Sequence, residues 1–292
     1  MSVPPSRLVS LIVARATMLA YPELLPELAR ALHAHGMHFL LSVIDHERET
    51  DDALAAIEAS DVAGIIAAAR PTEAAILRAA ARGIPLLLYN CHADGPTVDS
   101  VSCDHAACGH ALAAMLLRAG HRRFGIIGAP GDSLVGVERA AGAIRTLERG
   151  RALTIEIAQG DYSYASGAAA IDALFARMKP RPSAIIAMND AMAIGALDRA
   201  RDLQVRIPRD LSIVGIDGTQ IARLPSYDLT TMRQPLVRLA QMAVELLRER
   251  IAAPDRPPEV RLYGAELIEG RTARLERPVR RPQPKLTDRR AA

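Results

Sequence analysis

Residues 183–218 read SAIIAMNDAMAIGALDRARDLQVRIPRDLSIVGIDG and predict a strand, a helix and a second strand, in that order. The two apolar runs, 184–187 and 212–216, are short and continuous rather than alternating. Runs of this kind are typical of strands covered on both faces, as in a parallel sheet between two layers of helices. The segment between them, 191–203, has the length of a helix that crosses from one strand to the next.

The same alternation extends toward the N-terminus. Further strands are predicted at 9–13, 39–44, 62–67, 85–89, 124–127 and 153–157, and further helices at about 23–35, 51–59, 72–81, 106–119, 137–149, 164–179 and 235–252. The pattern runs twice, with a break at the sequence GAPG of residues 128–131. We therefore expect an α/β fold of two doubly wound, parallel-sheet (Rossmann-like) lobes with a cleft between them.

The order of segments predicts how the chain divides between the lobes. An extended polar stretch before the amphipathic helix at 235–252 offers a return path, so the N-terminal lobe is expected to comprise 7–129 plus 233–253. The C-terminal lobe is expected to comprise 130–232 plus 258–275, completed by short strands near 260–262 and 266–268. Residues 276–292 are basic and poor in apolar residues, which predicts a disordered tail.

Charge and cysteine content narrow the functional class. The 292 residues carry a net charge of +3, but from residue 271 onward eight Lys/Arg and two Asp/Glu give +6, which leaves −3 for the rest. A body without basic excess is not a nucleic-acid platform by itself. No apolar run approaches the roughly 18 residues of a membrane span, and three cysteines do not form a disulfide framework. We expect a cytoplasmic protein that does not contact a membrane.

Polar side chains follow several of the predicted strands. Ligands of doubly wound sheets bind beyond the carboxyl ends of the strands, so these side chains are candidates for a binding site. Rings offer stacking faces, and carboxylates, amides and guanidinium groups form paired hydrogen bonds with polar ligands. The candidate binding residues are Arg15, Thr17, Tyr21, Asp104, Arg139, Tyr162, Asn189 and Asp217.

Structural interpretations of the same residues stay open. Asp190 can cap the helix that follows it, Asp217 can be a turn residue, and Arg139 can be a solvated charge on a helix. The cysteines and histidines between residues 91 and 110 lack the paired spacing of a zinc site. Motifs of P-loop, zinc-protease and serine-hydrolase type are absent. We expect no metal, no cofactor and no catalytic residues.

Longer motifs carry a family resemblance. Residues 183–218, quoted above, and LTTMRQP at 229–235 resemble the effector-binding core of lactose-repressor (LacI/GalR) family transcription regulators. The segments VDSVSCD at 98–104, AGHRRFGIIGAP at 119–130, ERAAGAI at 138–144 and GDYSYASG at 160–167 resemble it as well. The resemblance covers about residues 7–275. It implies a fold like that of type I periplasmic binding proteins, three crossovers between the lobes, a small effector in the cleft and a homodimer.

The resemblance also assigns roles. Arg139 matches the effector-clamping arginine, Asp217 the cleft aspartate and Tyr162 the stacking aromatic residue. Asn189 with Asp190 matches an Asn-Asp pair, and Asp104 matches an acidic residue that opens a helix. The family reads operator DNA through an N-terminal helix-turn-helix, which these 292 residues do not include. We expect operator DNA to be a partner only through that module.

Two departures concern the ligand. In the family, the loop after the first strand usually reads like Asn-Pro-Phe-Phe, whereas here it reads Met-Leu-Ala-Tyr at 18–21. Gly218 stands where the family has the second aspartate of an Asp-Asp pair. Arg15 together with Arg139 favours an acidic ligand such as a sugar acid. The predicted function is an effector-sensing and dimerisation domain that binds a small polar metabolite, a sugar, sugar acid or similar. The alternative is an exported sugar-binding protein of a transport system, which shares this fold.

Overall fold

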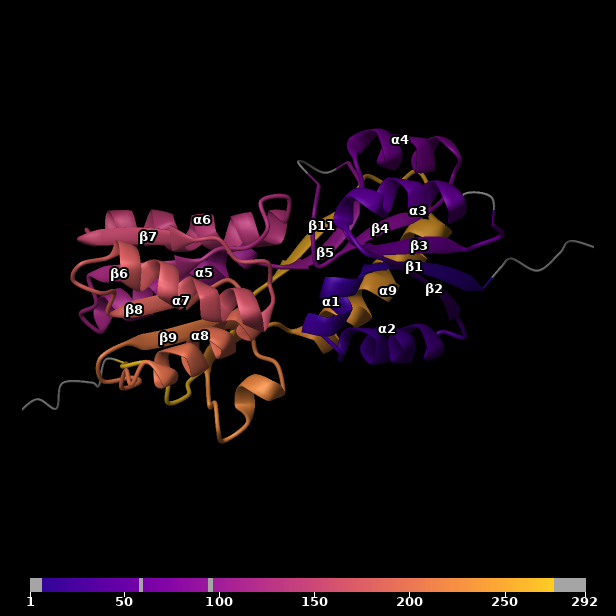
Figure 1. Cartoon of the computed structure of the whole chain (residues 1–292). Coiled ribbons are helices and arrows are strands. Elements are labelled where there is room, and N and C mark those ends of the chain that lie inside the picture. Colours follow the sequence, from indigo (N-terminus) through magenta and orange to yellow (C-terminus); the bar gives the residue numbers. More distant parts are fainter. Residues whose placement is uncertain (1–6, 58–59, 94–96, 276–292) are drawn as a thin grey trace, which may run out of the picture.

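The structure is a computed structural model that describes residues 7–57, 60–93 and 97–275, and it consists of two α/β lobes (Figure 1). The first sheet has the strand order β11-β5-β4-β3-β1-β2 and the second the order β12-β10-β9-β8-β6-β7. All the pairings are parallel except that of β10 with β12. This confirms the predicted fold class of two doubly wound, mostly parallel lobes.

The first sheet comprises β1 (Leu8–Ala14), β2 (His38–Ile44), β3 (Gly64–Ala68), β4 (Leu86–Tyr89), β5 (Asp99–Cys103) and β11 (Val260–Tyr263). The helices of that lobe are α1 (Arg15–Ala20), α2 (Leu24–His33), α3 (Thr50–Ile57), α4 (Glu73–Ala81) and α9 (Leu236–Ala252), with the short 3-10 turn η1 (Glu47–Glu49). Helix α9 packs against α2 and against β3, β4 and β5, as its buried stripe of Leu239, Ala243 and Leu247 requires.

The second sheet comprises β6 (Arg123–Ile127), β7 (Thr154–Ala158), β8 (Ala184–Ala187), β9 (Ser212–Asp217), β10 (Thr230–Arg233) and β12 (Glu266–Ile268). Its helices are α5 (His105–Arg118), α6 (Leu134–Arg149), α7 (Tyr164–Arg177) and α8 (Asp190–Asp202), with the 3-10 turn η2 (Ile221–Arg223). Every residue of β8 and β9 is buried, as expected for strands covered on both faces. Asn189 caps α8 by accepting a hydrogen bond from the Met192 amide.

Helices α5 and α6 touch through their backbones, which fixes the position of Arg139. A Cβ added at Gly109 of α5 would collide with the carbonyl oxygen of Arg139, and one at Gly142 of α6 would collide with that of Ala106. Only glycine allows this approach. The contact holds the first half of α6, and with it the Arg139 side chain, against the start of α5.

The chain crosses between the lobes after β5, after β10 and between β11 and β12. The expected boundary at residue 129 is wrong, because α5 packs on α6 and β6 pairs with β7 and β8 of the second sheet. The assignment of both final strands to the second lobe is also wrong, since β11 pairs with β5. The polar strands β5 and β10 contain no apolar run, so the hydrophobic pattern of the sequence did not predict them. The tail predicted at 276–292 lies outside the described residues.

Among the described residues, none of the helices combines the length and apolar character that a membrane span needs.

Candidate functional site

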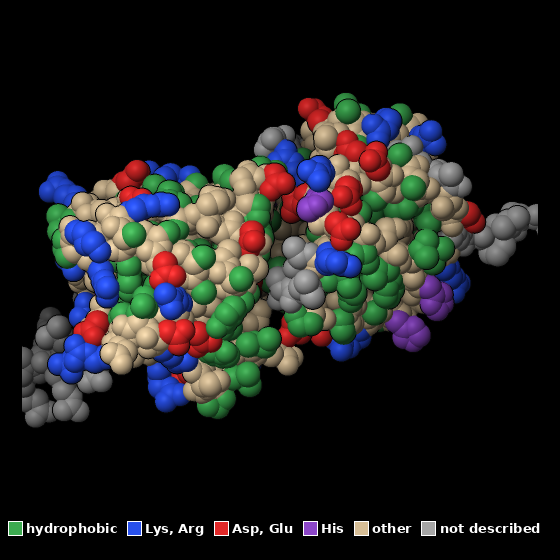
Figure 2. Space-filling view, viewed as in Figure 1, with side chains coloured by type: hydrophobic (Ala, Val, Ile, Leu, Met, Phe, Trp, Pro, Cys, Tyr) green, Lys and Arg blue, Asp and Glu red, His purple; other side chains and the backbone are tan. Residues whose placement is uncertain are grey.

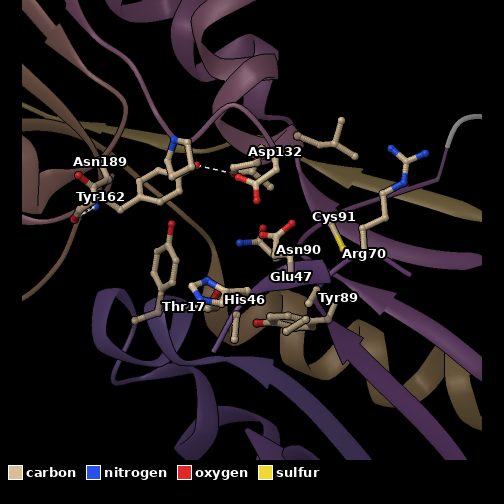
Figure 3. Close-up of a pocket in the computed structure, with 18 of the residues that line it drawn as sticks. Thr17, His46, Glu47, Arg70, Tyr89, Asn90, Cys91, Asp132, Tyr162 and Asn189 are labelled. Atoms are coloured by element: carbon tan, nitrogen blue, oxygen red, sulfur yellow. Dashed lines mark hydrogen bonds between the residues drawn. The ribbon is translucent and has the colours of Figure 1, made fainter. Parts of the chain in front are cut away.

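A cavity of about 400 Å³ lies between the lobes, within the size range of small-molecule sites. Residues at the carboxyl ends of β1, β2, β3 and β4 line it from the first lobe, and segments after β6, β7 and β8 line it from the second. Figure 3 shows polar and aromatic side chains from both lobes around it. Of the predicted site residues, the lining includes Thr17, Tyr21, Arg139, Tyr162 and Asn189.

The guanidinium group of Arg139 is buried at one wall of the cavity, with only 1% of the residue exposed. Its Nη1 lies 3.0 Å from Asp217 Oδ1 and donates to the Met188 carbonyl oxygen at 2.6 Å. Its Nη2 donates to the Tyr21 hydroxyl and its Nε to His105 Nδ1. Four of its five N–H donors therefore have protein acceptors. The interpretation of Arg139 as a solvated charge is wrong.

Asp217 ends β9 in a left-handed backbone conformation, with φ of 140°. Its Oδ1 accepts hydrogen bonds from the Tyr21 hydroxyl at 2.5 Å and from Gln234 Nε2 at 3.1 Å. Burial raises the pKa of this carboxyl, and the neighbouring guanidinium of Arg139 opposes that rise. Its Oδ2 has no hydrogen-bond partner among the described residues. Asp217 thus lies behind the cavity wall, in contact with Arg139 and Tyr21, rather than in the lining of the cavity.

The Tyr21 hydroxyl joins the two lobes. Tyr21 follows α1 in the first lobe, and its oxygen accepts from Arg139 Nη2 at 3.1 Å and from Gln234 Nε2 at 2.8 Å. The same hydroxyl donates to Asp217. With one bond donated and two accepted, the hydroxyl uses its full hydrogen-bonding capacity. Burial raises the pKa of this phenol well above its usual value, so the hydroxyl keeps its proton.

His105 is a further positioning residue that the sequence analysis did not single out for this site. Its Nδ1 accepts from Arg139 Nε at 3.3 Å, and its Nε2 lies 3.2 Å from the Asn90 carbonyl oxygen. Burial lowers the pKa of His105, and the positive charge of Arg139 lowers it further. A neutral imidazole with its proton on Nε2 satisfies both contacts. It links Asn90 at the end of β4 to Arg139 of the second lobe.

Tyr162 and Asn189 form one wall of the cavity. Tyr162 has a left-handed backbone with φ of 70°, and its carbonyl oxygen accepts from Asn189 Nδ2 at 3.0 Å. The phenol oxygen lies 2.6 Å from Ser133 Oγ, which fixes the ring against the cavity (Figure 3). The helix cap predicted for Asp190 is wrong, since Asn189 occupies that position. Asp190 is buried and accepts hydrogen bonds from Thr219 and Thr231.

Besides Asp217, two predicted site residues lie outside the cavity lining. Asp104 caps α5 by accepting from the Ala107 amide at 2.9 Å. The exposed Arg15 guanidinium lies 3.4 Å from Asp45 Oδ1. The structure therefore does not bring Arg15 and Arg139 into the cavity together. The argument for an acidic ligand loses its basis.

Several lining residues were not among the candidates. Most of them lie in or next to loops after strands: Asp45, His46, Glu47, Arg70, Tyr89, Cys91, Asp132 and Asp161. Cys91 and Asp161 were signalled by their places just after predicted strands. Burial raises the pKa of the Cys91 thiol to about 12, so it is protonated at neutral pH. Within the described ranges, no cluster of His, Cys, Asp and Glu has the arrangement of a metal site.

Comparisons with known proteins place this geometry in a family. Residues 113–273 match the model of the periplasmic binding protein-like domain. The HTH-type transcriptional repressor PurR of Proteus mirabilis is 35% identical over 173 residues, which are 58% of this chain and 50% of the repressor. PurR of Vibrio atlanticus is 28% identical over 193 residues, 65% of this chain and 58% of that protein. The chain spans a little over half the length of these curated relatives.

Solved structures share the whole fold. A LacI transcriptional regulator from Rhodococcus superimposes with a TM-score of 0.82 at 24% identity, over 91% of this chain and 98% of the other. A complex of the regulator CelR with cellobiose gives 0.81 at 24% identity, over 93% and 86%. The lac repressor dimer bound to operator and an anti-inducer gives 0.83 at 21%, over 92% and 95%.

Proposed function

Because the chain belongs to the periplasmic binding protein-like domain family, in the form found in LacI-family transcription regulators, we propose that it senses an effector and dimerises on behalf of such a regulator. The effector is a small polar metabolite, a sugar or a related compound, bound in the cavity between the lobes. The observation that carries the proposal is that both lobes line this cavity and that hydrogen bonds among Tyr21, Arg139 and Asp217 connect the lobes at its wall.

Binding acts through the arrangement of the lobes. A ligand in the cavity contacts Thr17 of one lobe and Tyr162 of the other, so its affinity depends on their separation. A ligand that prefers one arrangement shifts the population toward it, and a coupling of about 1–3 kcal/mol is typical of such systems. The effector would change the affinity for operator DNA only through a helix-turn-helix outside these 292 residues. The proposed location is the cytoplasm.

Exposed apolar side chains on both lobes support a homodimer. Leu40 and Val43 of β2, the edge strand of the first sheet, are 49% and 48% exposed. Ile221 and Leu224, in and next to η2 of the second lobe, are 58% and 49% exposed. An edge strand with exposed apolar side chains invites pairing with another chain. A second copy that contacts both lobes would also couple the arrangement of the lobes in one protomer to that in its partner.

The alternative of a transport binding protein has less support. The curated relatives are named as repressors, which favours the regulator and gives no support to an enzymatic function.

Ligand binding at the cavity wall tests the proposal. We would screen metabolites by thermal shift and compare the wild type with Tyr162→Ala and Tyr164→Ala. Tyr162 lines the cavity, whereas Tyr164 is exposed and hydrogen-bonds Asp198 on the surface. A ligand whose binding is lost only in Tyr162→Ala supports the proposal. Equal binding to all three proteins, or no binding by any metabolite, contradicts it.

A further inference from the structure

The wall of the cavity is rich in carboxylates. Four acidic residues line it, Asp45, Glu47, Asp132 and Asp161, against the two arginines Arg70 and Arg139. The charge of Arg139 is already balanced by Asp217, and most of its donors are used. Asp45 is paired with Arg15, so Glu47, Asp132 and Asp161 remain against Arg70 and the balance of the lining is negative. Such a wall repels an anionic ligand and attracts a cation.

Two of these carboxylates come from opposite lobes and line the same cavity. Glu47 begins η1 after β2 of the first lobe, and Asp132 lies in the loop between β6 and α6 of the second. Figure 3 shows both side chains directed into the same part of the cavity. Burial raises the pKa of Glu47, and the charge of Asp132 raises it further. Glu47 and Asp132 therefore repel each other across the cleft.

Aromatic faces complete the environment. Tyr89 at the end of β4 and Tyr162 after β7 line the cavity from the two lobes (Figure 3). The electron-rich faces of tyrosine rings attract cations as well as flat apolar surfaces. Carboxylates together with such rings form the usual environment for an ammonium or amidinium group. A carboxylate or phosphate ligand would find few donors, because Arg15 lies outside the cavity and Arg139 is engaged by protein acceptors. The remaining lining arginine, Arg70, is outnumbered by the carboxylates of Glu47, Asp132 and Asp161.

We infer that the effector carries a positively charged nitrogen, as in an amino sugar or an aromatic amine, which lies between Glu47 and Asp132 and draws the two lobes together. This inference rests on the proposed function and narrows it from polar metabolites in general to organic cations. Sugar acids, which the sequence analysis admitted, are excluded by the same charges. The repulsion between the two carboxylates keeps the free protein from closing, and the bound cation removes it.

The test is a thermal-shift and titration-calorimetry screen of a metabolite library that contains matched sets differing in charge. One set is D-glucosamine, D-glucose and D-glucuronate, and another is tyramine, tyrosol and 4-hydroxyphenylacetate. We expect the binding members to be amines. Their dissociation constants should rise at least about tenfold in Glu47→Gln and in Asp132→Asn, the loss expected for a charge-assisted hydrogen bond. Glu148→Gln, an exposed carboxylate of α6 away from the cavity, should bind within twofold of wild type.

A second measurement separates this effect from loss of structure. Without ligand, Glu47→Gln and Asp132→Asn should melt at the same temperature as wild type or higher, because each relieves the repulsion across the cleft. A neutral or anionic ligand that loses binding in Tyr162→Ala but not in Glu47→Gln would overturn the charge assignment and leave the proposed function standing. A library without any binding compound would count against both.

Discussion

The phenol of Tyr21, in the first lobe, donates a 2.5 Å hydrogen bond to Oδ1 of Asp217 in the second. Both groups are buried, and the same Asp217 oxygen faces Arg139. A hydrogen bond between the lobes contributes to the stability of the fold and also stabilises the lobe arrangement that forms the cavity. Its effect on each is measurable separately.

Tyr21→Phe should lower the free energy of unfolding by about 1–3 kcal/mol, because it leaves buried donors of Arg139 and Gln234 without their acceptor. Urea denaturation at neutral pH measures this loss. The control is Tyr263→Phe, whose hydroxyl has no hydrogen bond among the described residues and should change stability by less than about 0.5 kcal/mol. Equal losses in the two variants would show that the contact between lobes does not stabilise the fold.

Arg139 and Asp217 should depend on each other. Arg139→Met leaves a buried carboxylate without its cation and should cost about 3–5 kcal/mol, and Asp217→Asn leaves the cation without its carboxylate. The double variant removes both charges, so its loss should fall well below the sum of the single losses. A double-mutant cycle by denaturant unfolding measures the coupling. Additive losses would mean that the pair does not interact as the 3.0 Å separation implies.

The sequence predicts the architecture better than its boundaries, and the reason is visible in particular strands. Continuous apolar runs such as that of β8 identify strands buried on both faces. The strands at the crossovers, β5 and β10, are largely buried but contain Asp99 and Thr230, whose polar groups form hydrogen bonds with tertiary partners. Hydrophobicity alone cannot reveal such strands. Their absence from the pattern displaced the expected lobe boundary past α5.

The candidate site, too, is predicted in part by the sequence. Residues directly after strands, such as Tyr21 and Asn189, reach the cavity because parallel strands end at one edge of a sheet. Glu47 begins the 3-10 turn η1 and Asp132 lies in the loop before α6, where chain direction depends on packing rather than on local sequence. Arg15 follows β1 immediately, yet its side chain turns to Asp45. Position after a strand therefore indicates the edge of the site but not the direction of a side chain.

A pH-dependent contact also joins the lobes. His92 Nε2, in the loop after β4, lies 2.9 Å from Glu138 Oε1 of α6, and this hydrogen bond raises the pKa of His92. The folded-state pKa is above the unfolded value of about 6.5, so the contribution to stability is fully present below that pH and is lost as pH rises through the folded value. Arg70 opposes the rise.

Glu138→Gln should therefore destabilise the protein more at pH 5.5 than at pH 8, by a difference of up to about 1 kcal/mol for a partly exposed pair. Comparison with wild type at each pH removes the opposite effect of His105 and His121, whose pKa values are lowered by burial. Urea denaturation at both pH values gives the result. A difference that grows with pH would contradict the assignment.

The proposed homodimer should be sensitive to a charge placed among the exposed apolar side chains of the second lobe. Figure 2 shows hydrophobic side chains on the surfaces of both lobes, and Ile221 and Leu224 are among the exposed apolar residues of the second. Wild type should sediment as a dimer at micromolar concentration, and Leu224→Glu should shift it toward the monomer, because a buried carboxylate in an interface has no partner there. Leu77→Glu on α4, which is 58% exposed, is the matched control and should remain dimeric. A wild-type monomer, or equal dissociation of both variants, would place the interface elsewhere or remove it.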